Sequence, residues 1–446
     1  MPAMTSSLRL PLMFLVALAA AATVLLAQAP SPAGSSPARA AATPTANRAS
    51  AFAPERLALI DAMLQSYVDQ ELIGGAVALV LRDGRPAYQK AVGWADKEAR
   101  RPMRMDTMFR IASQTKAITS VAVLALVEDG KLGLSDPVGK FIPSFLKTTV
   151  AMRSESGTAS MVPAKRPITI RDLLTHTAGI SYGVDPHIAT QYSAKGLGPS
   201  AGAGWYFADK REPVCDAMER LGTLPFVAQP GEAWVYGYNT DVLGCVIERV
   251  SGQTLDAFIA ARITKPLGMN DTHFFLPAEQ RDRLAAVYAS GDNGRAVRAP
   301  EGARGQGSYV EGPRQTLSGG AGLLSTARDY GRFLEMIRGE GSLDGVRILS
   351  PHTVALMRTN QVGTLHSANG LGFGLGFETT DRYGANGMDD VGSFGWGGAY
   401  GTMYRIDPHA RLVIMLMLQQ LPNTTDVREK FPTMVYQALL DSPRLE

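Results

Sequence analysis

The chain has 446 residues, of which 45% are hydrophobic and 19% are charged, and its 44 basic side chains nearly balance its 41 acidic ones. This length can bury a large core, and a net charge of +3 without blocks of like charge argues against a nucleic-acid partner. The 46 glycines and the 7% content of aromatic residues suit a mixed α and β enzyme rather than a fibrous or disordered chain.

The first 50 residues have the composition of an export signal and a linker. An apolar stretch from Leu10 to Ala27 predicts a signal peptide over residues 1–29, or a membrane anchor if the signal is not removed. Cleavage is expected at the end of this stretch or nearer Ala40. Residues 30–50, rich in Ala, Pro, Ser and Thr, predict a flexible linker. We therefore expect a periplasmic or secreted protein, which the amino-terminal segment would hold at the membrane only if the signal is not removed.

The folded part is predicted to begin near Ala51 with an amphipathic helix, because apolar residues recur at helical spacing over residues 55–72. Two apolar runs at 75–81 and 87–93 follow, joined by a turn that contains Asp83-Gly84. This turn is a strong hairpin signal, so the two runs are expected to form antiparallel strands.

Good helix formers from Ala117 to Val127, closed by Asp129-Gly130, predict a buried helix with Ser113 at its amino end. The middle of the chain has helical patterns separated by long loops, and the last third returns to strands and ends in a helix. The expected later elements are helices at 168–175, 214–221 and 240–250, strands at 399–406 and 412–418, and a helix at 427–440.

These patterns predict an α+β fold, in which an antiparallel sheet made from both ends of the chain is flanked by helices and carries an inserted, mostly helical lobe. The α/β part is expected over about 51–111 and 320–446, and the helical part over about 112–319. Residues 51–446 would thus form one domain.

Two cysteines, Cys215 and Cys245, are present. The apolar surroundings of Cys245 favour a buried free thiol, with a single disulfide as the alternative if the protein is exported.

The chemistry is expected at Ser113 and Lys116 in the run Phe109-Arg-Ile-Ala-Ser-Gln-Thr-Lys116. A serine hydroxyl needs a neighbouring base, and a lysine three residues later on a helix lies on the same face. This spacing alone is weak, since Ser113 could be an ordinary helix cap and Lys116 a solvated charge. The apolar residues around it favour function, because a lysine is costly in such a setting unless it has a role or a partner.

Four segments together are far more specific, and they resemble the class C β-lactamase superfamily, above all its family VIII carboxylesterases. The likeness runs from about Ala51 to the carboxyl end. The segments are Phe109–Lys116, Ile168-Thr-Ile-Arg-Asp-Leu-Leu-Thr-His-Thr-Ala-Gly179, Gly319-Gly-Ala-Gly-Leu-Leu-Ser-Thr-Ala-Arg-Asp329 and Gly395-Trp-Gly-Gly398. The resemblance implies a β-lactamase-like fold and an acyl-enzyme mechanism without a cofactor.

The resemblance implies a catalytic tyrosine, for which Tyr236 and Tyr238 compete. The esterase form of the motif, a tyrosine followed five residues later by Asp-Val-Leu-Gly, selects Tyr236 through Asp241. The lactamase form, Tyr-x-Asn, does not fit Tyr236, because its asparagine is displaced by one place to Asn239. A tyrosinate beside the ammonium of Lys116 could accept the serine proton and return it to the leaving alcohol. Without the resemblance, Tyr236 would be interpreted as a core or loop residue.

Lactamases carry Lys-Thr-Gly where this chain has Trp396-Gly397-Gly398. The missing lysine favours uncharged esters, and two glycines allow close approach of the backbone. The resemblance implies an oxyanion hole made by the N–H groups of Ser113 and Ala399. The residues predicted to bind substrate are Gln114, Tyr238, Trp396, Gly397 and Gly398.

Two other motifs are interpreted as decoys. Gly179-Ile-Ser-Tyr-Gly183 matches the nucleophile elbow of α/β-hydrolases, but the preceding segment is predicted to be a helix rather than the required strand, which disfavours Ser181. The resemblance implies that His176 fixes a loop. The six histidines lack the close pairing of a zinc site, and no cofactor is expected.

The sequence therefore predicts an exported serine carboxylesterase for short-chain acyl esters, with a small-molecule ester as its partner. A β-lactamase, a D-alanyl-D-alanine peptidase or an acyltransferase of the same fold is the alternative. A non-catalytic binding protein is disfavoured, because such a protein would not need Ser113, Lys116 and Tyr236 in register.

Overall fold

The computed structural model describes residues 52–441 and Pro443, except 154–158, 200–208 and 303–304. The predicted signal and linker over residues 1–50 lie outside the described residues. Of the helices in the described part, none combines the length and apolar character that a bilayer crossing requires.

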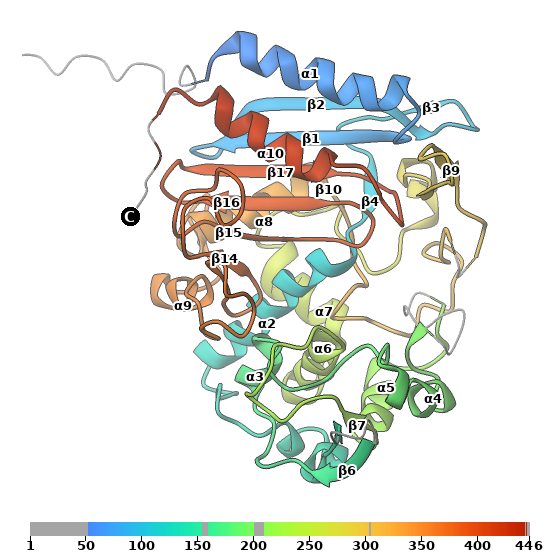
Figure 1. Cartoon of the computed structure of the whole chain (residues 1–446), viewed down its shortest axis with the longest axis vertical. Coiled ribbons are helices and arrows are strands. Elements are labelled where there is room, and N and C mark those ends of the chain that lie inside the picture. The colour runs from blue at the N-terminus through green and yellow to red at the C-terminus, as the bar shows by residue number, and fades with distance from the viewer. Residues whose placement is uncertain (1–51, 154–158, 200–208, 303–304, 442, 444–446) are drawn as a thin grey trace, which may run out of the picture. The chain divides into compact units, whose positions relative to one another are not determined.

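An eight-stranded antiparallel sheet combines both ends of the chain, as predicted (Figure 1). Strand β1 lies between β17 and β2, with Val80 opposite Ile414 in the first pair and opposite Tyr88 in the second. In spatial order the strands are β13 (Leu371–Phe373), β14 (Glu378–Thr380), β15 (Phe394–Gly397), β16 (Met403–Asp407), β17 (Leu412–Met417), β1 (Gly75–Arg82), β2 (Arg85–Asp96) and β3 (Arg101–Pro102).

Helices cover both faces of this sheet (Figure 1). Alternate residues of β1, such as Ala78 and Val80, pack with α1 (Pro54–Asp69) and α10 (Val427–Ala438), and the residues between them pack with α2 (Thr115–Glu128) and α8 (Ala327–Arg338). Because every residue of β1 is buried, its sequence is apolar from Gly75 to Leu81 instead of alternating with polar residues, and only its last residue, Arg82, is charged.

The middle of the chain is helical but also contains strands. A small sheet in the order β6-β5-β7 was not predicted, because its strands are short and two of their methionines, Met152 and Met161, are exposed. The elements are β5 (Thr149–Arg153), β6 (Ala159–Pro163), α3 (Ile170–Leu174), α4 (Pro186–Ala194), α5 (Val214–Leu221), β7 (Pro225–Phe226), α6 (Asn239–Ser251), α7 (Leu255–Ile259), β8 (Tyr288–Ser290) and β9 (Ala296–Arg298).

Four short strands and one helix complete the fold. They are β4 (Met108–Arg110), β10 (Leu324–Thr326), β11 (Ser342–Leu343), β12 (Val346–Arg347) and α9 (Pro351–Met357). The pairing of β4 with β10 anchors the chain immediately before Ser113.

Cys215 of α5 and Cys245 of α6 form a disulfide. The prediction of a free thiol was therefore wrong. The apolar run around Cys245 shows that this residue is buried, but it does not show that α5 packs on α6 and brings the second cysteine to a Cα–Cα distance of 4.9 Å.

Candidate active site

Ser113 lies in a short 3₁₀ helix, Ala112–Gln114, that leads directly into α2. Ala112 has a φ of 43°, in the left-handed region that non-glycine residues seldom adopt. The following turn places the Oγ of Ser113 3.2 Å from the Nζ of Lys116, as the spacing of the two residues predicts. Strained backbone of this kind is concentrated at functional sites, because the surrounding structure must hold it in place.

Lys116 is 2% exposed and makes three hydrogen bonds. Its Nζ contacts the Oγ of Ser113, donates to the phenol oxygen of Tyr182 at 3.0 Å, and donates to the carbonyl of Gly320 at 2.8 Å. An ammonium group has three N–H donors, so these contacts can use all of them. No described residue places a carboxylate within 4.0 Å of this nitrogen. Polar oxygens therefore replace water around Lys116.

Two tyrosines contact Lys116, and they do so differently. The ring of Tyr236 presents its face to Nζ, with 4.7 Å between Nζ and the ring centroid, whereas Tyr182 makes a hydrogen bond through its hydroxyl. The two rings meet edge to face at 5.7 Å. Sequence reasoning selected Tyr236 and missed Tyr182. Tyr182 belongs to the loop after α3, where no regular spacing relates it to Ser113.

Trp396 on β15 forms one wall of the site beside Tyr236. The indole Nε1 donates to the phenol oxygen of Tyr236 at 3.3 Å. Further rings extend the wall, and most of them belong to no motif that the sequence indicates. Rings within 6.4 Å of the Trp396 ring, centroid to centroid, belong to Trp234, Tyr236, His366 and Phe373.

His366 in this wall is held by Glu378, whose Oε2 lies 3.0 Å from the imidazole Nε2. The imidazole packs 4.4 Å from the ring of Trp234. Because the two residues of the pair are 12 positions apart and lie on different segments, no local spacing indicates their contact.

Gly397 and Gly398 let β15 approach its neighbours. A Cβ on Gly398 would collide with the carbonyl of Ile111, two residues before Ser113, and a Cβ on Gly397 would collide with the guanidinium of Arg428. The glycine at 398 therefore allows the strand end to lie against the turn that carries Ser113. This places the backbone of Ala399, the predicted second oxyanion donor, next to that turn.

Gln114 and Tyr238 lie elsewhere than predicted. Both side chains are fully buried, at 0% exposure, so they do not form the surface that would meet a substrate. The hydroxyl of Tyr238 accepts a hydrogen bond from the N–H of Gly198, and its ring packs on Tyr182 at 4.8 Å. The fold buries both side chains, that of Gln114 in the 3₁₀ helix and that of Tyr238 immediately before α6.

His176 fixes a loop, the role that the resemblance implied. Its Nδ1 lies 3.0 Å from the amide nitrogen of Asn239, and its carbonyl accepts from the N–H of Val235. Burial, together with the positive charge of Lys116 and the effect of His366, lowers the pKa of His176 well below its usual range, so the imidazole is neutral. The displaced asparagine of the Tyr-x-Asn motif thus connects His176 to the start of α6.

Ser181 has no activating base among its hydrogen-bond partners. Its Oγ accepts from the N–H of Gly183 at 3.0 Å, and the residues before it form the loop after α3 rather than a strand. This is not the strand–turn–helix context of a nucleophile elbow.

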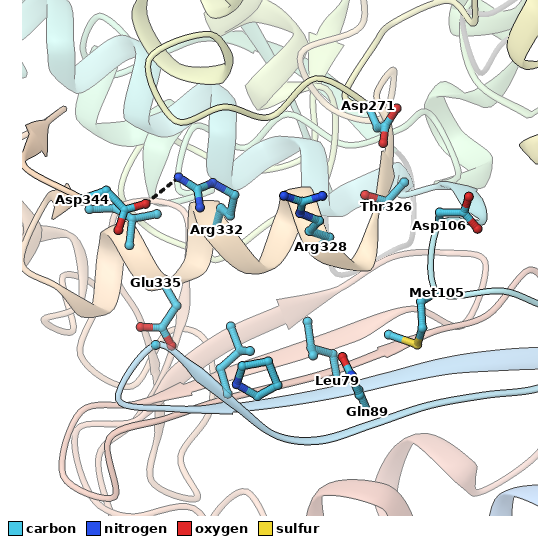
Figure 2. Close-up of a pocket in the computed structure, with 14 residues that line it drawn as sticks. Leu79, Gln89, Met105, Asp106, Asp271, Thr326, Arg328, Arg332, Glu335 and Asp344 are labelled. Atoms are coloured by element: carbon cyan, nitrogen blue, oxygen red, sulfur yellow. Dashed lines mark hydrogen bonds and ion pairs between the residues drawn. The ribbon is translucent and has the colours of Figure 1, made fainter. Parts of the chain in front are cut away.

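A separate cavity of about 550 Å³ lies between α8 and the β1–β2 hairpin (Figure 2). Leu79 is part of its apolar side, and Arg328, Arg332 and Glu335 project from α8. No serine, cysteine or lysine lines it. Within the described residues, no cluster of three His, Cys, Asp or Glu side chains could hold a metal ion. The arrangement suited to nucleophilic chemistry is therefore the one around Ser113.

Comparison with known proteins agrees with this arrangement. The Beta-lactamase family model matches residues 60–439. Esterase EstB from Burkholderia gladioli is 34% identical over 375 residues, which cover 81% of this chain and 89% of EstB. Lovastatin esterase from Penicillium rubens is 32% identical over 381 residues, which cover 78% of this chain and 89% of that protein.

A solved structure of a hydrolase is also similar to this chain. EstCE1, described as a hydrolase with promiscuous acyltransferase activity, superposes with a TM-score of 0.68 at 28% identity, covering 87% of this chain and 99% of EstCE1. The chain therefore belongs to the β-lactamase family, as an esterase-like hydrolase.

Proposed function

We propose that the protein is a serine carboxylesterase that hydrolyses short-chain acyl esters through an acyl-enzyme intermediate. The observation that carries the proposal is the 3.2 Å contact between the Oγ of Ser113 and the Nζ of Lys116 in a site where both side chains are buried. A hydroxyl beside a desolvated amine and two phenol groups is a nucleophile with an adjacent base.

In the proposed reaction, the Ser113 hydroxyl transfers its proton to the base as its oxygen attacks the ester carbonyl. Tyr236, as a tyrosinate stabilised by Lys116 and by the Trp396 N–H, is the proposed base. The backbone N–H groups of Ser113 and Ala399 are proposed to bind the oxyanion. The base returns the proton to the departing alcohol, and water then releases the acid by the same steps.

The wall around Trp396 supports an uncharged ester as the substrate. Trp396 stands where the resemblance to lactamases would place the lysine that pairs with a substrate carboxylate, and the rings of Tyr236 and Phe373 pack beside it. Aromatic surfaces of this kind favour the burial of apolar acyl or alcohol groups.

Acyl transfer to an alcohol is the second candidate. The similarity to EstCE1, with its described acyltransferase activity, favours it. Hydrolysis and transfer share the acyl-enzyme and differ only in whether water or an added alcohol accepts the acyl group. A β-lactamase or peptidase activity is the remaining alternative within the same fold.

One panel of substrates tests these proposals. Wild type, Ser113→Ala and Ser181→Ala are compared on p-nitrophenyl acetate, p-nitrophenyl butyrate and nitrocefin, with and without an added short alcohol. We expect ester turnover by wild type and by the Ser181→Ala control, and none by Ser113→Ala. Absence of ester turnover in folded wild type would overturn the esterase, a large preference for nitrocefin would assign a lactamase, and ester formation with the alcohol would assign a transferase.

We also propose that the protein is exported. The Cys215–Cys245 disulfide supports this proposal, because disulfides persist in oxidising compartments and are rare in the cytosol. The test is cell fractionation of the full chain with mass measurement of its amino terminus. Export predicts a periplasmic or secreted protein in which both cysteines are oxidised. A cytosolic protein with two free thiols would contradict it.

A further inference from the structure

A buried carboxylate lies behind Lys116. Asp241, in the first turn of α6, is 1% exposed, and its Oδ1 accepts hydrogen bonds from the hydroxyl of Ser318 at 2.5 Å and from the N–H of Gly320 at 3.0 Å. The carbonyl of the same Gly320 accepts from the Nζ of Lys116. One residue of backbone thus connects the carboxylate to the ammonium.

The packing holds the carboxylate close to this backbone. A Cβ on Gly320 would lie 2.5 Å from the Oδ2 of Asp241, so only glycine leaves room for the carboxylate. The Oδ2 atom itself is buried and has no hydrogen-bond partner among the described residues. A buried carboxylate oxygen without a hydrogen-bond partner calls for an explanation beyond packing.

We propose that Asp241 is a positioning residue that sets the protonation state of the Ser113–Lys116–tyrosine unit by supplying the counter-charge behind Lys116. The inference rests on the proposed function and extends it, because it assigns a role in the pH dependence of that site to a side chain that does not touch the reacting atoms.

The other charged or titratable groups near Lys116 do not supply a counter-charge. His176, at the carboxyl end of α3, is held neutral by burial, and on α8 the hydroxyl of Tyr330 donates to the carbonyl of Gln114. At the opposite end of α2, Arg262 pairs with Asp129. Within the part of the chain that the structure describes, the groups that face Lys116 are Ser113, Tyr182, Tyr236, His176 and Asp241. Asp241 is the carboxylate of this set.

Opposing effects act on the pKa of Asp241. Burial raises its pKa, whereas the charge of Lys116 and the hydrogen bonds from Ser318 and Gly320 lower it, and burial prevails. The ionisation of Asp241 therefore contributes to the pH dependence expected for the reaction.

The direction of the effect does not depend on which group is the base. Before Ser113 can attack, the unit must lose one proton, whether from the ammonium or from a phenol, and this loss makes the site more negative. An ionised Asp241 opposes that change. Replacing it with a neutral group therefore moves the acid limb of the activity profile to lower pH.

The experiment compares Asp241→Asn, Ser318→Ala and wild type in the full chain. The control is Glu248→Gln, which removes a carboxylate from the same helix, where Glu248 accepts from the N–H of Leu255. The readouts are the pH dependence of kcat/KM on p-nitrophenyl butyrate and of the labelling rate of Ser113 by a fluorophosphonate, which needs no ester substrate.

We expect the acid limb to move down by about one pH unit in Asp241→Asn, the low end of the usual effect of a nearby opposite charge. Ser318→Ala should move it in the same direction by less, since loss of the hydroxyl favours the neutral carboxyl. Glu248→Gln should leave it in place.

The inference would be overturned if the acid limb of the pH profile stays in place in both folded variants, Asp241→Asn and Ser318→Ala. This holds even if kcat falls. If Asp241→Asn does not fold, Ser318→Ala decides. Failure of wild type to label and to cleave esters would overturn the proposed function itself, so the two failures are distinguishable.

Discussion

The indole N–H of Trp396 donates a hydrogen bond to the phenol oxygen of Tyr236 across 3.3 Å. The donor would stabilise a tyrosinate more than a neutral tyrosine, because hydrogen bonds to charged acceptors are the stronger ones. Trp396 therefore contacts Tyr236, the base of the proposed mechanism, and is also part of the aromatic wall of the site.

Replacing Trp396 with phenylalanine should lower kcat about 10-fold, since a hydrogen bond to a charged group contributes about 1.5 kcal/mol or more. The acid limb of the pH profile should rise, because the tyrosinate loses a donor. The measurement is ester turnover from pH 5 to 10. Trp234→Phe is the control, because the Trp234 ring stacks on Tyr236 at 5.8 Å but its N–H has no partner among the described residues. Equal effects of the two variants would contradict the assignment.

Tyr236→Phe and Tyr182→Phe form a matched pair around Lys116. Loss of the base should lower kcat/KM by a factor of about 10² to 10⁴ in Tyr236→Phe. Loss of one acceptor of the Lys116 ammonium should cost Tyr182→Phe about 10-fold. Steady-state ester kinetics measure kcat/KM for both variants. A larger loss in Tyr182→Phe than in Tyr236→Phe would make Tyr182 the base.

Gly398→Ala should lower kcat by a factor of about 10² or more, because the added methyl pushes the end of β15 away from Ile111 and displaces an oxyanion donor. Gly133→Ala is the control, since a Cβ there makes only ordinary contacts with Asp136 at 3.5 Å. Ester kinetics and thermal unfolding are both measured. A loss of stability without a loss of kcat in Gly398→Ala would show that the contact is structural.

The double replacement of Cys215 and Cys245 by alanine should lower the free energy of unfolding by about 2 to 4 kcal/mol, as expected when a disulfide with a sequence separation of 30 is removed. Urea unfolding with and without reductant measures it. Wild type should lose stability in reductant and the variant should not. A variant as stable as the oxidised wild type would contradict the prediction.

Asp172 should stabilise the loop that carries His176 in a pH-dependent way. Burial alone would raise the pKa of Asp172, but hydrogen bonds from Arg166 and Thr169 outweigh it and hold the pKa below its usual range. A lowered folded-state pKa contributes stability that is complete above the unfolded-state pKa of about 4 and is lost as the pH falls through the folded-state value.

Asp172→Asn should therefore be less stable than wild type at pH 7, by about 1 kcal/mol for the lost capping bond, and the difference should shrink as the pH falls below about 4. Urea unfolding at pH 7, 5 and 3 tests this. A difference that is constant over this range would show that the carboxylate charge has no part in it.

The sequence predicted the parts of this protein that rest on local patterns. Helical spacing and the Asp83-Gly84 turn located α1, β1 and β2, and the three-residue spacing of Ser113 and Lys116 predicted their contact. These elements could be predicted because each depends on residues that are close together in the sequence. Trp396 was found through resemblance rather than spacing.

Contacts between distant segments could not be predicted. Tyr182, His366 and the Cys215–Cys245 disulfide depend on how loops and helices pack, and a local pattern does not encode that packing. The burial of Gln114 and Tyr238 could not be predicted either, because a sequence motif does not encode the direction in which each of its side chains points.

The pairing of Arg82 with Leu412 has a consequence for the order of folding. A ribosome must finish nearly the whole chain before β1 receives its second partner, and until then the strand presents an unpaired edge. The nucleophile, which lies between these two strands in sequence, can be assembled only after the last strand has been made. A nascent chain that lacks β17 therefore lacks the completed sheet beside which the site is built, so activity at Ser113 is expected only after nearly all of these residues have been made.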